Sequence, residues 1–272
     1  MRLDLEKGNG SMDKQISFGD ALEKMEQWLS HPAMKPKHIR ELKALEDRLV
    51  KNSGDKEAKE DIVDRFYKDL DFGTGGLRGI LGAGTNRMNI FTVRRVTQGF
   101  ADYINRSYGG KAKEPSVAIA YDSRNGSARY ALEAAGVLAG NGIHVYIYQE
   151  LMPTPALSFA VRHYDCAGGI MITASHNPAN YNGYKVYNSE GCQVTEEAAA
   201  EILRCIEEVD IFTGVRTAGM EASDLLVTTF WDEKRHENID TIPEKVIDEY
   251  IGAVKAKRVG VDCGDMEIVY TP

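Results

Sequence analysis

Short apolar runs alternate with helical patterns between residues 116 and 209, and this alternation constrains the fold more than any other feature of the chain. In chain order the segments are strand 116–121, helix 128–140, strand 144–149, helix 155–164, strand 168–174 and helix 195–209. Helices of this length between strands form βαβ crossovers, in which parallel strands share one sheet with helices on both faces. The sequence therefore predicts an α/β domain over 71–212, with a mixed, mostly parallel sheet sandwiched by helices.

An all-helical arm is predicted before this domain, over residues 1–70. Three stretches carry apolar residues at helical spacing, namely Leu22, Met25 and Leu29, then Ile39, Leu42, Leu45 and Leu49, then Ile62, Val63, Phe66 and Leu70. The polar segment 51–60 separates the last two stretches as a surface connector. Residues 1–11 are interpreted as a candidate tag remnant, with Met12 as the native start.

The last part of the chain, 213–272, is predicted to hold a linker and the truncated start of a second α/β domain. Thr241 and Glu244 match a capping box, and Pro243 would lie just inside the helix that follows. A further strand is expected over 266–272. One helix and one strand are too little to bury a core, so this second domain is interpreted as cut short.

Charge and cysteine content exclude several classes of partner. The chain carries 33 basic and 41 acidic residues, a net charge of −8, and no basic run that could follow a nucleic-acid backbone. No apolar run approaches the roughly 18–20 residues that span a bilayer, so neither nucleic acid nor a membrane is an expected partner. The four cysteines have no paired spacing and are expected to be reduced, which predicts a cytoplasmic protein. The sequence carries no prediction of an oligomeric state.

Polar loops follow the predicted strands at the positions where open α/β sheets bind their ligands, the carboxyl ends of the strands. These loops are "YDSRNGS" at 121–127, "LMPTPA" at 151–156 and "SHNPANYNG" at 175–183. The glycine-rich "FGTGGLRG" at 72–79 joins them if its strand runs alongside. We expect the loops to converge at one edge of the sheet.

Ser175 is the candidate nucleophile of the third loop. A serine is weak at neutral pH and needs a base, a metal or an electrophile held in line. No G-x-S-x-G motif surrounds Ser175, and His176, as the next residue, is expected to project away from it and to make a poor triad base. Asn182 and Gly183 are expected to form a turn that leads to Lys185.

A phosphoryl carrier explains these residues better than a hydrolase triad. A phosphoserine bears about −1.5 to −2 charges and requires a divalent cation and cationic donors nearby. Lys185 and Arg78 are candidates for the positive charge, and Mg²⁺ is the usual metal of phosphoryl transfer. The alternative is that "SHNP" only ends a strand in a turn, since Ser and Asn-Pro favour turns.

Two other loops contribute candidate substrate-binding residues, each with an alternative role. Thr74 and Arg78 lie where small residues let backbone amides approach an anion, although a glycine-rich hairpin with one exposed arginine would have the same sequence. Asp122 and Arg124 are candidates for substrate contact, and an ion pair or a cap at the start of the next helix is the alternative. The glycines match neither of the common nucleotide-binding patterns, so no nucleotide is predicted.

These motifs together resemble the α-D-phosphohexomutases, the phosphoglucomutase/phosphomannomutase family. "TASHNP" followed by "NGYKVY" is similar to the phosphoserine loop of that family, and "FGTGGLRG" to its first substrate-side loop. "AYDSR" and "MPTPA" stand in the same order and spacing. The resemblance covers about 70–272, and the arm is similar to that of the bacterial phosphoglucomutase and phosphopentomutase-like subgroup.

The resemblance implies a role for each matched position. Ser175 would carry the phosphoryl group and bind Mg²⁺ through a phosphate oxygen, while His176 and Lys185 would act beside it, Lys185 in proton transfer. Thr74 and Arg78 would line the same cleft. The implied reaction interconverts glucose 1-phosphate and glucose 6-phosphate through a sugar bisphosphate, so a phosphosugar and its bisphosphate are the expected partners.

The resemblance also implies parts that this sequence does not contain. Family members have four domains, with the main metal ligands in the second, the sugar-reading loop in the third and a distal phosphate site in the fourth. The chain is therefore interpreted as an N-terminal fragment with little activity alone, and its main Mg²⁺ ligands are expected beyond residue 272. A phosphopentomutase and a non-catalytic phosphosugar-binding module are the alternatives.

Overall fold

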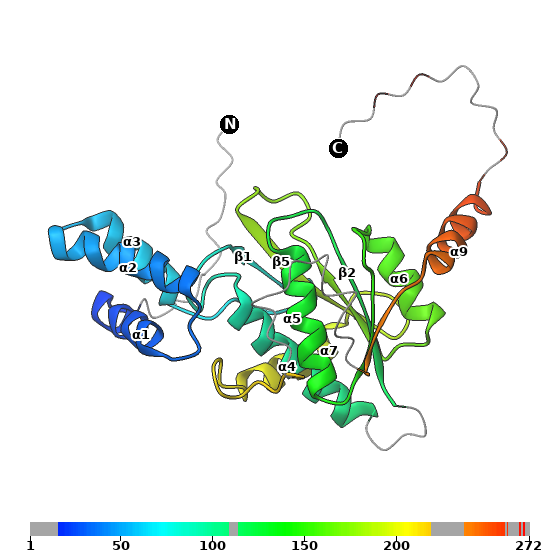
Figure 1. The fold of residues 1–272 in the computed structure, drawn as a ribbon, viewed down its shortest axis with the longest axis horizontal. Coiled ribbons are helices and arrows are strands. Elements are labelled where there is room, and N and C mark those ends of the chain that lie inside the picture. The colour runs from blue at the N-terminus through cyan, green and yellow to red at the C-terminus, as the bar shows by residue number, and fades with distance from the viewer. Residues whose placement is uncertain are drawn as a thin grey trace, which may run out of the picture.

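A six-stranded sheet with helices on both faces forms the centre of the computed structural model (Figure 1). The structure describes residues 16–108, 114–218 and 237–258, together with the single residues 260, 267 and 269. The strands are β1 (Leu77–Ile80), β2 (Ser116–Tyr121), β3 (His144–Ile147), β4 (Gly168–Ile172), β5 (Tyr181–Asn188) and β6 (Ile239–Thr241). Their order across the sheet is β1-β5-β4-β2-β3-β6.

The predicted mixed, mostly parallel sheet is confirmed. Strand β2 is parallel to both β3 and β4, and β6 is parallel to β3 at one edge. Strand β5 is antiparallel to β4 and to β1, which forms the other edge. Strand β6 is an addition that the sequence does not predict, because three residues between polar segments give too short a pattern.

The helices predicted above agree with the structure within a few residues, except that one begins at Lys56, within the stretch 51–60 expected as a surface connector. The described residues form eight helices. They are α1 (Phe18–Ser30), α2 (Pro36–Lys51), α3 (Lys56–Phe66), α4 (Ile90–Tyr108), α5 (Ser127–Gly140), α6 (Thr154–His163), α7 (Glu196–Glu207) and α9 (Glu244–Lys255). Several begin at the caps that their sequences suggest: Ser17, Asp55 and Thr195 each accept a hydrogen bond from a first-turn amide. None of the described helices is both long and apolar enough to cross a bilayer.

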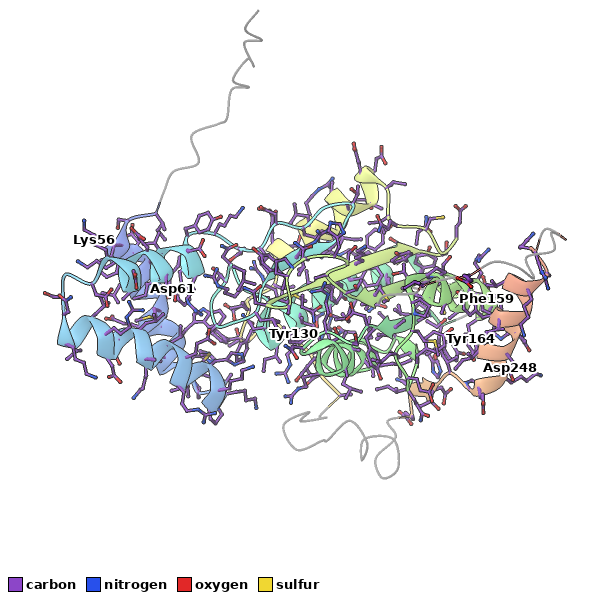
Figure 2. The ribbon with its side chains drawn as sticks, turned by 90° about the horizontal axis from the view of Figure 1, so that it is seen from above. Lys56, Asp61, Tyr130, Phe159, Tyr164 and Asp248 are labelled. Atoms are coloured by element: carbon purple, nitrogen blue, oxygen red, sulfur yellow. The ribbon has the colours of Figure 1, made fainter. Side chains whose placement is uncertain are left out.

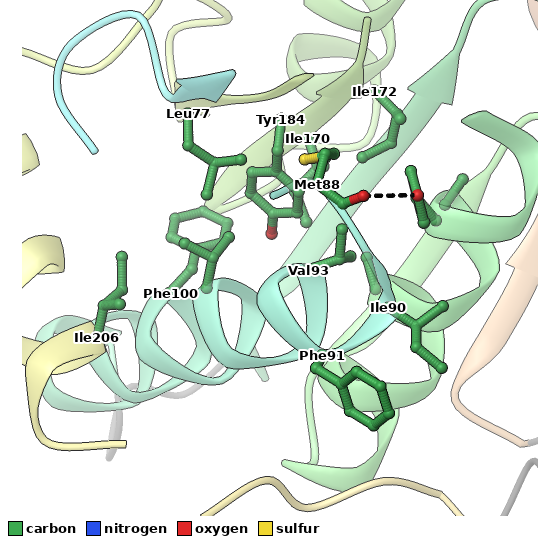
Figure 3. Packing of buried hydrophobic residues seen from close by; sticks show 14 of the residues in the cluster. Leu77, Met88, Ile90, Phe91, Val93, Phe100, Ile170, Ile172, Tyr184 and Ile206 are labelled. Carbon is green, nitrogen blue, oxygen red and sulfur yellow. Dashed lines mark hydrogen bonds between the residues drawn. The ribbon is translucent and has the colours of Figure 1, made fainter. Parts of the chain in front are cut away.

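The two faces of the sheet carry separate apolar layers. Helices α4, α5 and α7 cover one face, where Phe100, Ile170, Ile172 and Tyr184 pack together (Figure 3). Helix α6 covers the other face over a smaller cluster, and α9 lies beside α6 (Figure 1). The central strands β2 and β4 are buried along their whole length, as their uncharged sequences require. The sheet is therefore a rigid support for the loops at its edge.

The helical arm α1–α3 packs against the α/β domain through an aromatic cluster and an ion-pair network. Trp28 is 3% exposed, and its ring centre lies 5.3–5.6 Å from those of Phe66, Phe91 and Phe212. Arg65 donates to Glu41 over 2.6 Å and to the Ala83 carbonyl over 3.0 Å. Figure 2 shows the arm, marked by Lys56 and Asp61, at the opposite end of the molecule from α9, marked by Asp248.

His38 of α2 lies buried at this junction, and its Nδ1 has no hydrogen-bond partner among the described residues. Its ring centre is 5.5 Å from that of Phe91. Burial lowers the pKa of His38 below its usual value, and Glu41 opposes the shift, while Lys37 and Arg129 add to it. The folded chain therefore binds a proton at His38 less readily than the unfolded chain does.

We expect this histidine to make the chain less stable in mild acid. Because its folded pKa lies below the unfolded value of about 6.5, stability falls as the pH drops through and below that value. In His38→Leu, the free energy of unfolding should fall less between pH 7.5 and about pH 5 than in the parent. Urea titrations at each pH measure this, with Val50→Ala, at an 80% exposed position, as the control. Equal pH dependence in His38→Leu and the parent would contradict the expectation.

The C-terminal region differs from the prediction in one detail. Thr241 is the last residue of β6 and pairs with Ile147, so its backbone is extended and it is not the N-cap of α9. Pro243 occupies the cap position instead, without a side-chain hydrogen bond, and the predicted capping box is wrong. The strand expected over 266–272 lies outside the described residues, apart from two single positions. The domain boundary at residue 213 stays a prediction.

Candidate active site

Ser175 stands beyond the carboxyl end of the central strand β4, where the chain leaves the sheet. Ala174 is fully buried, whereas Ser175 is exposed. The Ser175 amide donates to Thr173 Oγ1 over 3.0 Å, and the Asn177 amide donates to the Ala174 carbonyl over 3.1 Å. Ser175 has a φ of 55°, in the left-handed region that residues other than glycine seldom adopt. The loop thus presents the hydroxyl to solvent from a strained backbone.

His176 lies beside Ser175 and does not project away from it, so that expectation is wrong. The distance from His176 Nδ1 to Ser175 Oγ is 3.2 Å. The reason is the left-handed backbone at Ser175, which turns the chain so that two consecutive side chains lie close together. The imidazole is therefore within hydrogen-bond reach of the candidate nucleophile.

Lys185 lies on β5, the strand next to β4, and is opposite Met171 in the register. Its neighbours Tyr184 and Val186 belong to the core beneath α4 and α5, so Lys185 points to the other face of the sheet. Burial raises the pKa of Tyr184 well above its usual value, and its hydroxyl lies 3.0 Å from Thr97 Oγ1. Among the described residues no carboxylate pairs with Lys185. That Lys185 reaches a phosphate on Ser175 stays a prediction.

Asn182 and Gly183 lie within β5 and do not form the expected turn. The fully buried Asn182 amide donates to the Asn125 carbonyl over 3.0 Å and to Ser127 Oγ over 2.9 Å. A Cβ on Gly183 would lie 2.6 Å from the Thr173 carbonyl oxygen, so the glycine permits close approach of the backbone. This Asn-Gly pair therefore ties β5 to the neighbouring loop. The sequence gives no sign that this asparagine is buried in a strand, because an Asn-Gly pair usually indicates an exposed turn.

The glycine-rich loop packs directly on the strand that carries Lys185. Gly73 and Gly76 exchange amide-to-carbonyl hydrogen bonds of 3.1 and 2.8 Å, which places Thr74 at the exposed tip of a tight turn. Gly76 has a φ of 76°, and a Cβ there would lie 1.9 Å from the Tyr184 carbonyl oxygen. Only glycine fits this contact. The substrate role of Thr74 stays a prediction.

Arg78 joins the glycine-rich loop to the Ser175 loop. It lies on β1 opposite Gly183, and its Nη1 donates to Asn177 Oδ1 over 2.7 Å. The side chain is exposed, and no other described residue accepts from it. Arg78 therefore brings a positive charge and unoccupied donors to the loop of the candidate nucleophile. Asn177, whose sequence context predicts no role, is the residue that holds it there.

Asp122 and Arg124 form the ion pair and helix start that the sequence offered as an alternative to substrate contact. Asp122 Oδ2 lies 3.6 Å from Arg124 Nε. Asp122 Oδ1 accepts from the Arg124 amide over 3.0 Å and from Ser127 Oγ over 2.7 Å, at the start of α5. The Arg124 guanidinium also donates to backbone carbonyls of the Ser175 loop. A direct contact of either residue with substrate stays a prediction.

A shallow hollow of about 530 Å³ lies between the loops that follow β2 and β4. Its lining consists of Asp122, Ser123, Arg124, Asn125, Ser175, Asn177 and Ala179. The loop after β3 lies next to it, because the Met152 amide donates to the carbonyl of Tyr121 at the end of β2, over 3.0 Å. The polar loops therefore meet at the carboxyl edge of the sheet, as expected for an α/β ligand site.

The described residues do not by themselves fit the Mg²⁺ that the resemblance implies. They contain no group of three or more His, Cys, Asp or Glu side chains that could hold a metal. Asp122, the carboxylate in the hollow, already accepts two hydrogen bonds and pairs with Arg124. A phosphate on Ser175 would supply oxygen ligands, and the others are not among these residues.

Fold and site together define an α/β domain whose ligand loops surround an exposed, strained serine at the carboxyl edge of a mixed sheet. Comparison with known families gives the class a name. The chain belongs to the phosphoglucomutase/phosphomannomutase family, whose alpha/beta/alpha domain I matches residues 69–211.

Individual relatives agree with this family. The chain is 36% identical over 225 residues to a phosphoglucomutase of Staphylococcus aureus (strain bovine RF122 / ET3-1), which covers 83% of this chain and 38% of the relative. It is 35% identical over 230 residues to the Staphylococcus saprophyticus phosphoglucomutase, which covers 85% and 39%. A phosphoglucomutase/phosphomannomutase family protein of Burkholderia thailandensis shares the fold, with a TM-score of 0.50 at 20% identity over 68% of this chain and 35% of that one. The chain thus spans less than half the length of these relatives.

Proposed function

We propose that this chain carries the phosphoryl-accepting serine of a phosphosugar mutase that interconverts glucose 1-phosphate and glucose 6-phosphate. The observation that supports this most directly is the exposed Ser175, held in a left-handed conformation at the carboxyl edge of the sheet. Arg78 and His176 lie on the same loop cluster, and both can face an anion. The family and its phosphoglucomutase members supply the substrate class.

The proposed reaction moves one phosphoryl group in each direction. The sugar hydroxyl attacks the phosphorus of phosphorylated Ser175, the P–Oγ bond breaks, and its electron pair returns to Oγ. The hydroxyl proton passes to Lys185, which enters the step as the neutral amine, and protonated His176, whose Nδ1 lies 3.2 Å from Ser175 Oγ, donates a proton to the departing Oγ. The return transfer reverses both proton movements. The resulting sugar bisphosphate turns over and returns its other phosphoryl group to Ser175, which restores the phosphoenzyme.

Charge supports a phosphoryl group at this position despite the acidic composition of the chain. The charge of −8 is a sum over the whole molecule, whereas Arg78 approaches the Ser175 loop with donors that no described residue other than Asn177 occupies. Mg²⁺, when bound, would neutralise oxygens of the phosphate on Ser175. In the proposal Thr74 lines the sugar side of the cleft, at the exposed tip of the glycine-rich turn.

A cytoplasmic location is part of the proposal. Of the described cysteines, Cys192 and Cys205 form no disulfide, and Cys205 is buried. Reduced cysteines are typical of a reducing compartment. That compartment also holds the phosphorylated sugars on which the proposed reaction depends.

Phosphate uptake from a sugar bisphosphate tests the proposal. Loading of Ser175 is a single transfer and does not require the turnover that the chain alone is expected to lack. We therefore expect the 272-residue chain, incubated with glucose 1,6-bisphosphate and Mg²⁺, to gain the mass of one phosphoryl group and to release one equivalent of glucose monophosphate. Peptide mapping should place the group on Ser175. Ser189→Ala, at an exposed serine at the end of β5, is the matched control and should gain the same mass.

The alternatives give different results in the same experiment. Faster uptake from ribose 1,5-bisphosphate than from the hexose would favour a phosphopentomutase. Binding of the bisphosphate without any covalent mass would favour a phosphosugar-binding module. Either outcome would overturn the proposed function.

A further inference from the structure

The Arg124 side chain directs its donors to the backbone of the loop that carries Ser175. Its Nη2 donates to the carbonyls of Ser175 and Asn177, over 2.6 and 2.7 Å. Its Nη1 donates to the carbonyls of Pro178 and Tyr181, over 3.0 and 3.4 Å. One guanidinium therefore contacts four carbonyl oxygens across the whole turn between β4 and β5.

The guanidinium is itself fixed to the rigid part of the domain. The side chain is 16% exposed, and Nε lies 3.6 Å from Asp122 Oδ2 at the end of β2. The other Asp122 oxygen accepts from Ser127 Oγ at the start of α5, and the buried Asn182 donates to that same hydroxyl. Arg124 thus connects the loop after β2, held by a strand and a helix, to the loop after β4.

The Ser175 loop needs such a support because its backbone is strained. A left-handed conformation is unfavourable for a residue other than glycine, and it persists only where the surroundings fix it. The internal bonds of the loop to Thr173 and Ala174 hold the amides of Ser175 and Asn177. Arg124 holds the carbonyls of those same two residues, on either side of His176.

We propose that Arg124 is a positioning residue, whose guanidinium holds Ser175 in the left-handed conformation that aims its hydroxyl into the hollow. Each Nη has two N–H groups, and each already faces two carbonyl oxygens, so no Nη donor is left for a substrate phosphate. The charge of Arg124 is paired with Asp122. Arg78, with a single acceptor among the described residues, is the arginine that remains available to the substrate.

The catalytic consequence rests on the proposed function of Ser175. A displacement of about 1 Å can slow a positioned reaction by about 10²-fold. A lysine offers a compact ammonium with three donors and cannot match four acceptors in the plane of a guanidinium. In Arg124→Lys we therefore expect phosphate uptake from glucose 1,6-bisphosphate to slow by about 10²-fold, while the bisphosphate concentration that half-saturates the uptake rate stays within about twofold of the parent.

Amide hydrogen exchange measures how firmly the Ser175 loop is held, and it does not depend on phosphoryl transfer. In Arg124→Lys the amides of Ser175, Asn177 and Tyr181 should exchange at least about tenfold faster, whereas Ile170 of β4 keeps its protection. Arg106→Lys is the matched control, because Arg106 pairs with Glu208 at an exposed position and the same change there should alter neither uptake nor exchange in the loop.

The effect of Ser175→Gly on stability, compared between the parent and Arg124→Lys in a double-mutant cycle, gives a second test that requires no activity. Glycine removes the strain of the left-handed backbone, so Ser175→Gly should lower the unfolding equilibrium constant about two- to fivefold in the parent. In Arg124→Lys the loop is free to relax, and the same change should give no gain. Asp122→Asn, which keeps the guanidinium and removes only the charge of its anchor, should show the uptake and exchange effects in weaker form if Arg124→Lys does not fold.

The outcomes separate this inference from the proposed function. If the parent chain takes up no phosphate, the proposed function fails, while exchange and the double-mutant cycle still decide the role of Arg124 in the loop. If the parent is loaded and Arg124→Lys is loaded equally fast, the positioning role is overturned. A raised half-saturating concentration of the bisphosphate with unchanged amide exchange in the loop would also overturn it, because Arg124 would then contact the substrate directly.

Discussion

Ser175→Ala is expected to take up no phosphoryl group from glucose 1,6-bisphosphate, however long the incubation. The variant removes the hydroxyl and leaves the loop geometry in place, since alanine occupies the same backbone with the same strain. His176 and Lys185 remain, so a covalent mass in the variant would show that a histidine or another group is the acceptor. Intact-mass measurement after incubation, with far-ultraviolet circular dichroism to verify the fold, decides this.

Ser175→Gly should share the loss of uptake while it gains stability. At a φ of 55°, glycine avoids a strain of about 1–2 kcal/mol, and its greater freedom in the unfolded chain offsets about 0.4–1 kcal/mol of that gain. A net stabilisation of about 0.5–1 kcal/mol is the expected result, measured by urea unfolding. Ser175→Ala should stay near the parent in the same titration.

Comparison of Ser175→Ala with Ser175→Gly separates the loss of phosphate uptake from the relief of backbone strain. If Ser175→Gly is less stable than Ser175→Ala, the left-handed conformation does not carry the expected strain, and the inference about Arg124 loses its physical basis. If both variants lose uptake but only glycine gains stability, the serine hydroxyl is kept at a cost in stability. Strained residues of this kind are concentrated at functional sites.

Much of the fold follows from local sequence pattern. The uncharged runs that form β2 and β4 are buried along their whole length, so their sequences alone predict buried strands. Amphipathic spacing likewise locates α1 to α3, because each helix buries a single face. Strand β6 has three residues between polar neighbours, and its pairing with β3 depends on tertiary contacts that no local pattern encodes.

The site is harder to predict, because its contacts depend on backbone geometry. The sequence places Ser175 and Arg78 in loops at the sheet edge. Arg78 in fact lies on β1, and its side chain meets the Ser175 loop through Asn177. The position of His176 beside Ser175 depends on the positive φ of Ser175, and a serine in a sequence does not predict a positive φ. The four carbonyl bonds of Arg124 require the folded loop, so the pattern "YDSR" could only offer an ion pair or a substrate contact.

Trp28→Ala is expected to destabilise the chain by about 3–5 kcal/mol, the usual range for truncating a buried aromatic residue. The indole is 3% exposed and packs edge-on against Phe66 of α3, Phe91 of α4 and Phe212, which follows α7. These rings come from both sides of the junction between the arm and the α/β domain. Alanine would leave a cavity that none of the three neighbours can fill without moving its own helix or segment.

Urea unfolding of Trp28→Ala beside Val50→Ala measures this effect. Val50 is 80% exposed on α2, so its truncation should change stability by less than about 0.5 kcal/mol. A loss in Trp28→Ala as small as in the control would mean that the arm does not pack on the domain through this cluster.

Since Arg65 and Glu41 also bind the loop that leads from β1 to α4, a weakened arm should loosen the chain next to Arg78. Faster amide exchange at Ala83 in Trp28→Ala would show that the arm supports the edge of the sheet where Arg78 meets the Ser175 loop.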